Sequence, residues 1–263
     1  MAKKILLETA LSIALAFLFS CSFSCKTVNS SSNSDVQSMD GTSGPPIKIV
    51  MLGDSITWGV TSGLLKEEES AMSTFGYAAR FVEMAKDNSL NYTFENAGCP
   101  GGTTYDFIQA PNVACGKLNK DTVFNLVAKD KLPADYLTIL LGTNDAAGYM
   151  EDHPSSGSEY KENLVKIISL AKGFGVKKKV ILMTPPPSPC STFDRQKVER
   201  LKIYTEKVAE ICKEDPKVVC GPDMQSILNY NDFDNCDVHP TKGGHLKMAQ
   251  ALYKFLYTIE QKP

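Results

Sequence analysis

Five short apolar runs constrain the fold of this chain more than any other feature of its sequence. The runs lie at 47–52, 92–96, 134–141, 180–184 and 218–220, and the first four end at a glycine or a proline. Stretches with helical apolar spacing lie between or after them, at 75–85, 159–173, 196–212 and 241–259. Each run has the length and composition of a buried strand, so the pattern predicts alternating strands and helices.

Alternation of this kind predicts a parallel sheet with helices packed on both of its faces. We expect an α/β fold, a three-layer α/β/α flavodoxin-like sandwich with a central, mostly parallel five-stranded sheet. The last helix should turn an apolar face inward, formed by Leu246, Met248, Ala249, Leu252 and Phe255. Sites in such sheets form where the strands end, so the residues after each strand are the first candidates for function.

The N-terminal segment differs in character from the rest of the chain. A short basic start precedes the apolar run ALSIALAFLF, which is too short to span a membrane and suits the core of a signal peptide. A small residue and then Cys21 follow, which resembles a bacterial lipoprotein signal that is lipidated at Cys21. Cys25 is a weaker second candidate, and a plain secretory signal is the alternative. We therefore divide the chain into a signal peptide (1–20), a Ser-rich flexible tether (21–45) and one folded domain (46–263).

The composition excludes several classes of function. The chain has 28 Lys and Arg against 30 Asp and Glu, and its pI is about 6.0, so we expect no nucleic-acid partner bound through bulk positive charge. A hydrophobic content of 43% excludes a disordered chain. With three histidines and no C-x-x-C, H-E-x-x-H or phosphate-loop string, the sequence predicts no metal site and no cofactor.

Four residues suited to acyl transfer follow predicted strands or precede the last helix. Ser55 lies in GDSITWG after the first strand, Gly98 in NAG after the second, Asn144 in GTND after the third, and His239 in DVHP before the helix. Serine supplies a nucleophile, histidine accepts its proton, and N–H donors stabilise the oxyanion that develops. Because parallel strands end at one edge of a sheet, we expect these four residues to lie together.

These four strings, in this order, resemble the SGNH/GDSL hydrolase family of esterases and lipases, including its bacterial carbohydrate-esterase-like members. The resemblance covers the chain from about 47 to 256. It implies that Ser55 is the nucleophile, that His239 is the general base, and that the N–H groups of Ser55 and Gly98 and the side-chain amide of Asn144 form the oxyanion hole. The chain contains no G-x-S-x-G string, which argues against the other α/β-hydrolase arrangement.

The chain departs from the family at the residue that orients the histidine. The family usually places an aspartate three residues before this histidine, but Cys236 stands there in this sequence. Asp237 lies two residues before His239, and Asp234 lies five before it. We assign Asp237 to this role, with Asp234 and a backbone carbonyl as alternatives.

The same residues also have structural interpretations. Ser55 could cap a helix, Asn144 could satisfy loop backbone groups, and His239 could be a structural residue before a helix. Trp58, beside the nucleophile, either lines the substrate cleft or packs in the interior. Structural roles are expected for Asp54, Asp145 and His245, and His153 is expected in an exposed loop.

Six cysteines remain in the predicted domain, which suggests disulfides in an exported protein. They are Cys99, Cys115, Cys190, Cys212, Cys220 and Cys236. The order of the predicted elements favours the pairings 99–115, 190–236 and 212–220, and buried free thiols are the alternative. A 190–236 bridge would brace the loop that carries the catalytic histidine.

Together these observations predict a monomeric serine ester hydrolase that is exported and lipid-anchored to a bacterial membrane, in the cell envelope or at the surface. Its expected substrate is a small-molecule or glycan ester with an acetyl or other short acyl group. A lysophospholipase and an acyltransferase with the same site are alternatives within this class. A non-catalytic surface module that binds a glycan or a protein is the alternative from another class.

Overall fold

The computed structural model describes residues 45–65, 74–88, 90–109, 121–148, 155–188, 195–235 and 237–261. The signal peptide, the tether and the proposed lipidation site lie outside these residues. The central sheet is entirely parallel, with the strand order β2-β1-β3-β4-β5. Its strands are β1 (Ile47–Gly53), β2 (Tyr92–Gly98), β3 (Ala134–Leu140), β4 (Val176–Leu182) and β5 (Val218–Cys220).

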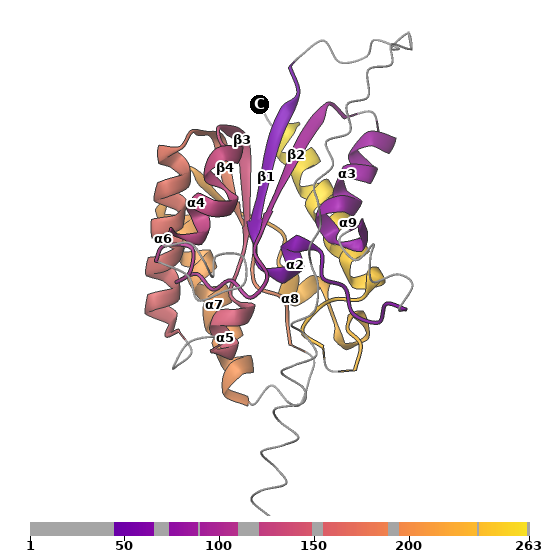
Figure 1. Ribbon diagram of the computed structural model, residues 1–263, viewed down its shortest axis with the longest axis vertical. Helices are drawn as coiled ribbons and strands as arrows, with labels where there is room; N and C mark the ends of the chain where they lie inside the picture. The colour runs from indigo at the N-terminus through magenta and orange to yellow at the C-terminus, as the bar shows by residue number, and fades with distance from the viewer. Residues whose placement is uncertain are drawn as a thin grey trace, which may run out of the picture. The chain divides into compact units, whose positions relative to one another are not determined.

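Helices cover both faces of this sheet (Figure 1). The long ones are α3 (Tyr77–Asp87), α6 (Gly157–Gly173), α7 (Arg195–Glu214) and α9 (Lys242–Glu260). The short ones are α2 (Ser55–Trp58), α4 (Val123–Val127), α5 (Thr143–Ala147), α8 (Met224–Ile227) and the 3-10 turns η2 (Lys129–Lys131) and η3 (Tyr230–Asp232). Helices α6 and α7 lie on one side of the sheet and α3 and α9 on the other, which confirms the three-layer α/β/α prediction.

The alternation of side chains along β1 explains the two hydrophobic layers. Val50 and Leu52 point into the core that contains residues of α6 and α7, whereas Ile49 and Met51 point into the core that contains residues of α3 and α9. All four side chains are completely buried. A strand that helices cover on both faces is apolar along its buried length. Strand β1 is therefore apolar apart from one lysine near its start.

The strand order creates a single point of reversal, between β1 and β3. Strand β1 pairs with β2 on one side and with β3 on the other. The chain leaves β1 toward α3 on one face of the sheet and leaves β3 toward α6 on the other face. The last residues of the three strands are level, because Gly53 pairs with both Gly98 and Leu140. Open parallel sheets hold their ligands outside the carboxyl ends of the strands at such a reversal.

Two sequence predictions about element boundaries and faces are wrong. Strand β4 begins at Val176, four residues before the predicted start at 180, because pairing with β3 draws in the polar run Lys177–Lys179. Leu246 on α9 is 42% exposed, although it was expected to face the core. Its neighbour His245 is completely buried instead, so the inward face of the helix is rotated by one position there.

Among the described residues, the structure places both cysteines of one disulfide. Cys212 at the end of α7 and Cys220 at the end of β5 are bonded, with their Cα atoms 5.5 Å apart, which is the pairing favoured from the sequence. Cys99 is also in a disulfide, but Cys115, Cys190 and Cys236 lie outside the described residues. None of the helices that the structure describes is long and apolar enough to cross a membrane.

Candidate active site

The turn after β1 fixes the position of Ser55. Gly53 closes the strand, and a Cβ atom there would overlap Thr57 Oγ1 and lie 2.5 Å from a carbonyl oxygen of β3. Only glycine therefore lets α2 pack this closely on the end of the sheet. Asp54 caps the helix, because its carboxylate accepts the N–H of Ile56 at 2.9 Å. Ser55 is thereby presented at the N-terminus of α2.

Asp54 supports the turn from inside the protein. The residue is 1% exposed, and burial raises the pKa of its carboxyl to about 6, although the hydrogen bond from Ile56 opposes this rise. The side-chain nitrogen of Asn144 lies 3.5 Å from its second carboxylate oxygen. These contacts give Asp54 the structural role expected from the sequence, since they hold the nucleophile turn and the Asn144 segment together.

The loop between η3 and α9 brings a histidine to the serine. Phe233 and Pro240 form an antiparallel bridge that closes this loop. His239 Nε2 lies 2.8 Å from Ser55 Oγ, although the two residues are 184 positions apart in the chain. A hydrogen bond of this length allows the imidazole to accept the serine proton.

Asp237 holds the other side of the imidazole. Its Oδ1 lies 2.7 Å from His239 Nδ1 and also accepts the His239 backbone N–H at 3.1 Å. Burial works against ionisation, but the hydrogen bonds and charge of His239 hold the pKa of the Asp237 carboxyl below its usual range. Asp234, the alternative, instead presents its backbone carbonyl to the Asp237 N–H at 2.8 Å. The ring of His239 is therefore oriented with Nδ1 toward Asp237 and Nε2 toward Ser55.

Gly98 does not present a free N–H at the end of β2. Its N–H donates to Asn96 Oδ1 at 2.8 Å, and Asn96 Nδ2 donates to the Thr57 carbonyl at 2.9 Å. A Cβ atom at Gly98 would lie 2.7 Å from Trp58 Cα. Glycine is thus required at this position because α2 packs against the end of β2. The Gly98 N–H, which was predicted to be an oxyanion donor, is instead used by Asn96.

The next turn of the chain offers a backbone donor that sequence reasoning missed. Gly102 N–H donates to the Cys99 carbonyl at 2.9 Å, and Gly101 has a φ of 79°. Proline at 100 followed by glycine at positive φ is the pattern of a type II turn, in which the N–H of the third residue is not used by the turn. The Gly101 N–H donates to no other described group. The P-G pair in the sequence was the signal for this geometry.

Asn144 reaches the same region from the start of α5. Its side-chain nitrogen donates to the Gly102 carbonyl at 3.1 Å, which places the amide beside the 99–102 turn. The next residue, Asp145, is completely buried and accepts hydrogen bonds from the N–H and the hydroxyl of Thr104. Asp145 therefore has the structural role expected from the sequence, because it ties the loop after β2 to the helix after β3.

The other two histidines do not belong to this site. His245 is completely buried: its Nδ1 accepts the Tyr77 N–H at 3.1 Å, and its Nε2 lies 2.9 Å from the Val60 carbonyl. Burial lowers its pKa to about 4, so the ring is neutral and structural at ordinary pH. His153 lies outside the described residues. Within the described part of the chain, no group of three potential metal ligands comes together.

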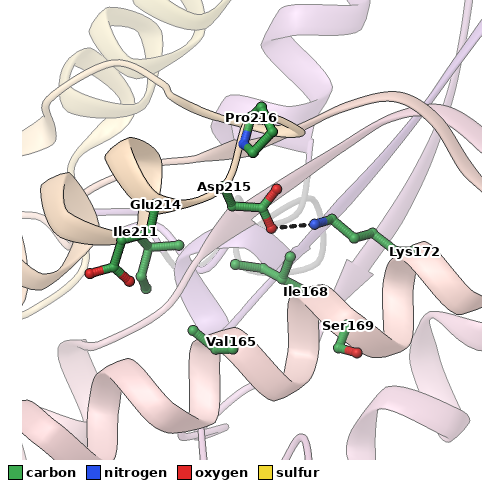
Figure 2. Close-up of a pocket in the computed structure, with 8 residues that line it drawn as sticks. All are labelled: Val165, Ile168, Ser169, Lys172, Ile211, Glu214, Asp215 and Pro216. Atoms are coloured by element: carbon green, nitrogen blue, oxygen red, sulfur yellow. Dashed lines mark hydrogen bonds and ion pairs between the residues drawn. The ribbon is translucent and has the colours of Figure 1, made fainter.

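A groove of about 480 Å³ lies away from these residues, between α6 and α7. Figure 2 shows its walls, with Val165, Ile168 and Ser169 from α6 and an ion pair between Lys172 and Asp215 across one end. None of the residues that line it belongs to the Ser55 site, and it holds no nucleophile paired with a base. The groove therefore has no part in the chemistry considered below.

Serine hydrolases use a serine, an imidazole and a carboxylate joined by hydrogen bonds for acyl transfer. Ser55, His239 and Asp237 have this arrangement outside the carboxyl ends of the strands. The class indicated by the fold and this geometry is thus a hydrolase. The sequence profile of the GDSL-like lipase/acylhydrolase family matches residues 51–247, and the chain belongs to this family. It is accordingly an esterase.

Solved structures with the same fold include enzymes that act on acetylated carbohydrates. The acetylxylan esterase Axe2 from Geobacillus stearothermophilus is 21% identical, with a TM-score of 0.59 over 81% of this chain and 95% of that chain. Est24, a carbohydrate acetylesterase from Sinorhizobium meliloti, is 19% identical, with a TM-score of 0.60 over 81% and 99%. LAE5, an alpha/beta hydrolase from the metagenome of Lake Arreo, is 20% identical, with a TM-score of 0.57 over 79% and 93%. No match was found among curated proteins.

Proposed function

We propose that this protein is a serine esterase that removes acetyl or other short acyl groups from a carbohydrate. The observation that carries the proposal is the hydrogen-bonded chain Ser55–His239–Asp237. It lies where the strand order of the sheet reverses, in a chain that belongs to the GDSL-like lipase/acylhydrolase family. The carbohydrate part of the proposal is supported by the structural similarity to Axe2 and Est24.

In the first half of the reaction, Ser55 Oγ attacks the ester carbonyl carbon while its proton passes to His239 Nε2. Asp237 stabilises the imidazolium that forms and keeps Nε2 directed at the serine. The tetrahedral intermediate then collapses, the bond to the alcohol oxygen breaks, and His239 returns the proton to that oxygen. The acyl group remains on Ser55, and the sugar alcohol leaves.

The negative charge on the carbonyl oxygen needs donors that are fixed before the reaction. We assign this role to the N–H groups of Ser55 and Gly101 and to the side-chain amide of Asn144, which has two N–H groups and donates to the Gly102 carbonyl with one of them. The Ser55 and Gly101 N–H groups have no acceptor among the described residues, whereas the Gly98 N–H is already used by Asn96. In the second half of the reaction, His239 takes a proton from a water molecule that attacks the acyl-enzyme, and the same donors hold the second oxyanion. The bond between the acyl carbon and Ser55 Oγ then breaks, His239 returns the proton to Ser55, and the carboxylic acid leaves.

The position of Trp58 favours a sugar over a lipid as the alcohol. Trp58 is 49% exposed and lies three residues after Ser55, so the two side chains share one side of the short helix α2. Aromatic faces bind the C–H faces of sugar rings, and such a surface close to the nucleophile can seat a ring next to its ester.

The test of this function is turnover with a matched variant. The purified domain should hydrolyse p-nitrophenyl acetate and release acetate from acetylated xylan, and Ser55→Ala should lower kcat by at least about 10⁴-fold. Activity that survives Ser55→Ala would reject the mechanism. A panel of acetyl, butyryl and long-chain esters, including a lysophospholipid, fixes the acyl and alcohol parts. Glycan binding without any ester turnover would point to a binding module instead.

We further propose that the protein is exported and anchored through a lipid on Cys21. The tether predicted at 21–45 joins the domain at the amino end of β1, and Ser55 lies beyond the carboxyl end of the same strand. Seven residues of strand separate these ends by about 20 Å. The attachment point and the site thus lie at opposite edges of the sheet. Cys21→Ser should release the protein from the membrane fraction, and Cys25→Ser, the matched control, should not.

A further inference from the structure

A group of lysines lies at the amino end of the sheet, opposite the end that carries Ser55. Its members stand before β3, at the start of β4 and before β5, and we call them the basic rim: Lys129, Lys131, Lys177 and Lys217. The backbone brings these segments together, because Ala134 pairs with Val176 on the neighbouring strand. The Val180 N–H likewise donates to the Lys217 carbonyl at 3.0 Å.

The basic rim carries positive charge that ion pairs in the described part of the chain do not neutralise. None of its four lysines forms an ion pair with a described residue, and three of them are exposed, with Lys131 partly exposed. Other lysines nearby do have partners, since Lys172 pairs with Asp215 and Lys178 Nζ lies 3.0 Å from Glu260. The paired acids at this end are therefore held by lysines outside the rim.

Two further acids lie close to the basic rim without cancelling its charge. Asp130 stands between two rim lysines, and the Asp135 carboxylate accepts the Lys48 N–H at 2.8 Å. Four lysines against these two carboxylates leave positive charge in excess. The chain as a whole has a net charge of −2, so the attraction of this surface for an anion is local and acts over about 8 Å at physiological salt.

The ordinary structural reason for lysines at this end of the sheet does not cover the basic rim. Lys86, Lys172 and Lys213 occupy the last turns of α3, α6 and α7, where a positive charge offsets the helix dipole. Lys177 instead belongs to a strand, and Lys217 belongs to the turn before one. Their charges therefore complement no helix end.

Exposed aromatic side chains accompany the lysines. Phe174, at the end of α6, is 37% exposed, and Lys129 Nζ lies 5.6 Å from the centre of its ring. Tyr257, near the end of α9, is 48% exposed and lines a shallow pocket of about 290 Å³ with Pro45 and Leu90. Lysines together with half-exposed aromatic rings are the side chains that proteins place at the boundary between lipid headgroups and water.

The chain enters the domain at this same end of the sheet. Pro45 precedes β1, whereas α2 and the nucleophile lie at the other end, as Figure 1 shows. Cys21 and Pro45 are 24 positions apart. A flexible tether of that length, as the sequence predicts, has a root-mean-square span of about 27 Å. An anchor on Cys21 would thus hold the amino end of the sheet close to the membrane surface.

We propose that the basic rim and Phe174 dock on the headgroups of an anionic lipid bilayer and hold the Ser55 site facing away from it. This inference rests on the lipid anchor proposed above. Each lysine near such a surface strengthens binding about fivefold, so four give less than about 10³-fold. That is weaker than stable anchoring, and the lipid on Cys21 is still needed to keep the protein on the membrane.

Docking is measured without the anchor, in residues 21–263 carrying Cys21→Ser. The protein should sediment with vesicles of equal parts phosphatidylglycerol and phosphatidylcholine but not with phosphatidylcholine alone, and added salt should release it. Lys177→Gln combined with Lys217→Gln should lower the partition coefficient about 25-fold. Lys202→Gln, whose side chain is 61% exposed near the start of α7, is the control and should change it less than about twofold.

The orientation is measured by quenching of tryptophan fluorescence with brominated lipids. Trp58 is the single tryptophan and lies at the site end of the sheet, so bound vesicles should leave its emission unquenched. Trp58→Phe combined with Phe174→Trp moves the fluorophore to the basic rim, and the same vesicles should then quench it. Quenching of Trp58 in the parent protein would overturn the proposal, because the site end would then face the lipid.

The remaining outcomes separate docking from the anchor. Equal binding to both kinds of vesicle, no binding to either, or equal losses in the rim variant and in Lys202→Gln would overturn docking, even where Cys21→Ser releases the protein from cell membranes. Vesicle binding that the rim variant weakens, together with a Cys21→Ser protein that stays in the membrane fraction, would support docking and reject the lipid on Cys21.

Discussion

The two halves of the candidate site are built in different ways. The nucleophile turn, residues 53–59, is packed between the ends of two strands, and its buried carboxylate, Asp54, is 1% exposed. The histidine loop, residues 233–240, lies at the surface, and the side chain of its carboxylate, Asp237, is 40% exposed. Steric contacts fix the first region, whereas hydrogen bonds fix the second. Added bulk in the turn should therefore cost stability, and loss of the Asp237 carboxylate in the loop should cost activity alone.

The largest effect is expected in the histidine loop. Asp237→Ala should lower kcat on p-nitrophenyl acetate by about 10³- to 10⁴-fold, because His239 loses both its orientation and the charge that stabilises its protonated form. The urea midpoint should stay within the error of the wild type, since the side chain is partly exposed. Asp130→Ala serves as the control for loss of a carboxylate. A loss of less than tenfold would show that another group orients His239.

The nucleophile turn should respond in the opposite way. Gly53→Ala should lower the free energy of unfolding by about 3 kcal/mol, since the new methyl group would be forced against Thr57 and the backbone of β3. Gly173→Ala is the matched control, because nothing lies within 4 Å of a Cβ atom there and helical alanine is favoured over glycine. Both are measured by urea denaturation. Equal stability of the two variants would contradict the steric account of the turn.

Two buried titratable groups close to the turn should oppose each other as the pH falls. The pKa of His245 is lowered to about 4, so between pH 6.5 and 4 only the unfolded chain takes up its proton. The free energy of unfolding therefore falls as the pH falls through this range. The pKa of Asp54 is raised to about 6, so between pH 6 and 4 the folded chain takes up the proton first, and stability rises as the pH falls. Each contribution is about 3 kcal/mol, and the two nearly cancel.

Asp54→Asn separates the two contributions and keeps a good helix cap. The variant should be more stable than the wild type by up to about 3 kcal/mol at pH 7, because the wild type ionises a buried carboxyl there. This advantage should shrink to nothing by pH 4. The same acid dependence in both proteins, measured by urea denaturation from pH 4 to 7, would be incompatible with a raised pKa of Asp54.

The sequence was informative where burial and strand ends decide the structure. The apolar runs predicted all five strands, and the strings after them predicted that Ser55, Asn144 and His239 would meet at one edge of the sheet. This works because a parallel sheet buried on both faces leaves a strong apolar signal and a fixed edge for the residues that follow.

The sequence was less informative where one hydrogen bond decides the outcome. The Gly98 N–H is taken by Asn96, two residues earlier, an Asx turn that the string N-A-G allows but does not require. Likewise, the spacing of Asp234 and Asp237 could not show which carboxylate reaches His239, because the loop is closed by a bridge between Phe233 and Pro240. Local turn geometry of this kind depends on contacts that are distant in the chain.

The smallest expected effect concerns Trp58, whose backbone is packed but whose side chain is exposed. Its backbone belongs to the sterically fixed turn, but its side chain is 49% exposed. Because it is the single tryptophan of the chain, its fluorescence reports on this position alone. In a Ser55→Ala background, an acetylated xylo-oligosaccharide should shift the emission to shorter wavelength as the ring leaves water. Trp58→Ala should weaken binding roughly two- to tenfold, the range for one aromatic contact.

Trp58→Phe keeps an aromatic face and is the control that should retain most of the affinity. If the oligosaccharide binds by calorimetry but leaves the emission unchanged, the substrate contacts the histidine loop without the nucleophile turn. If a lysophospholipid shifts the emission and the oligosaccharide does not, the exposed ring serves a lipid ester. Either result would show that the nucleophile turn and the histidine loop differ in function, because the turn would then position the nucleophile without recognising the sugar.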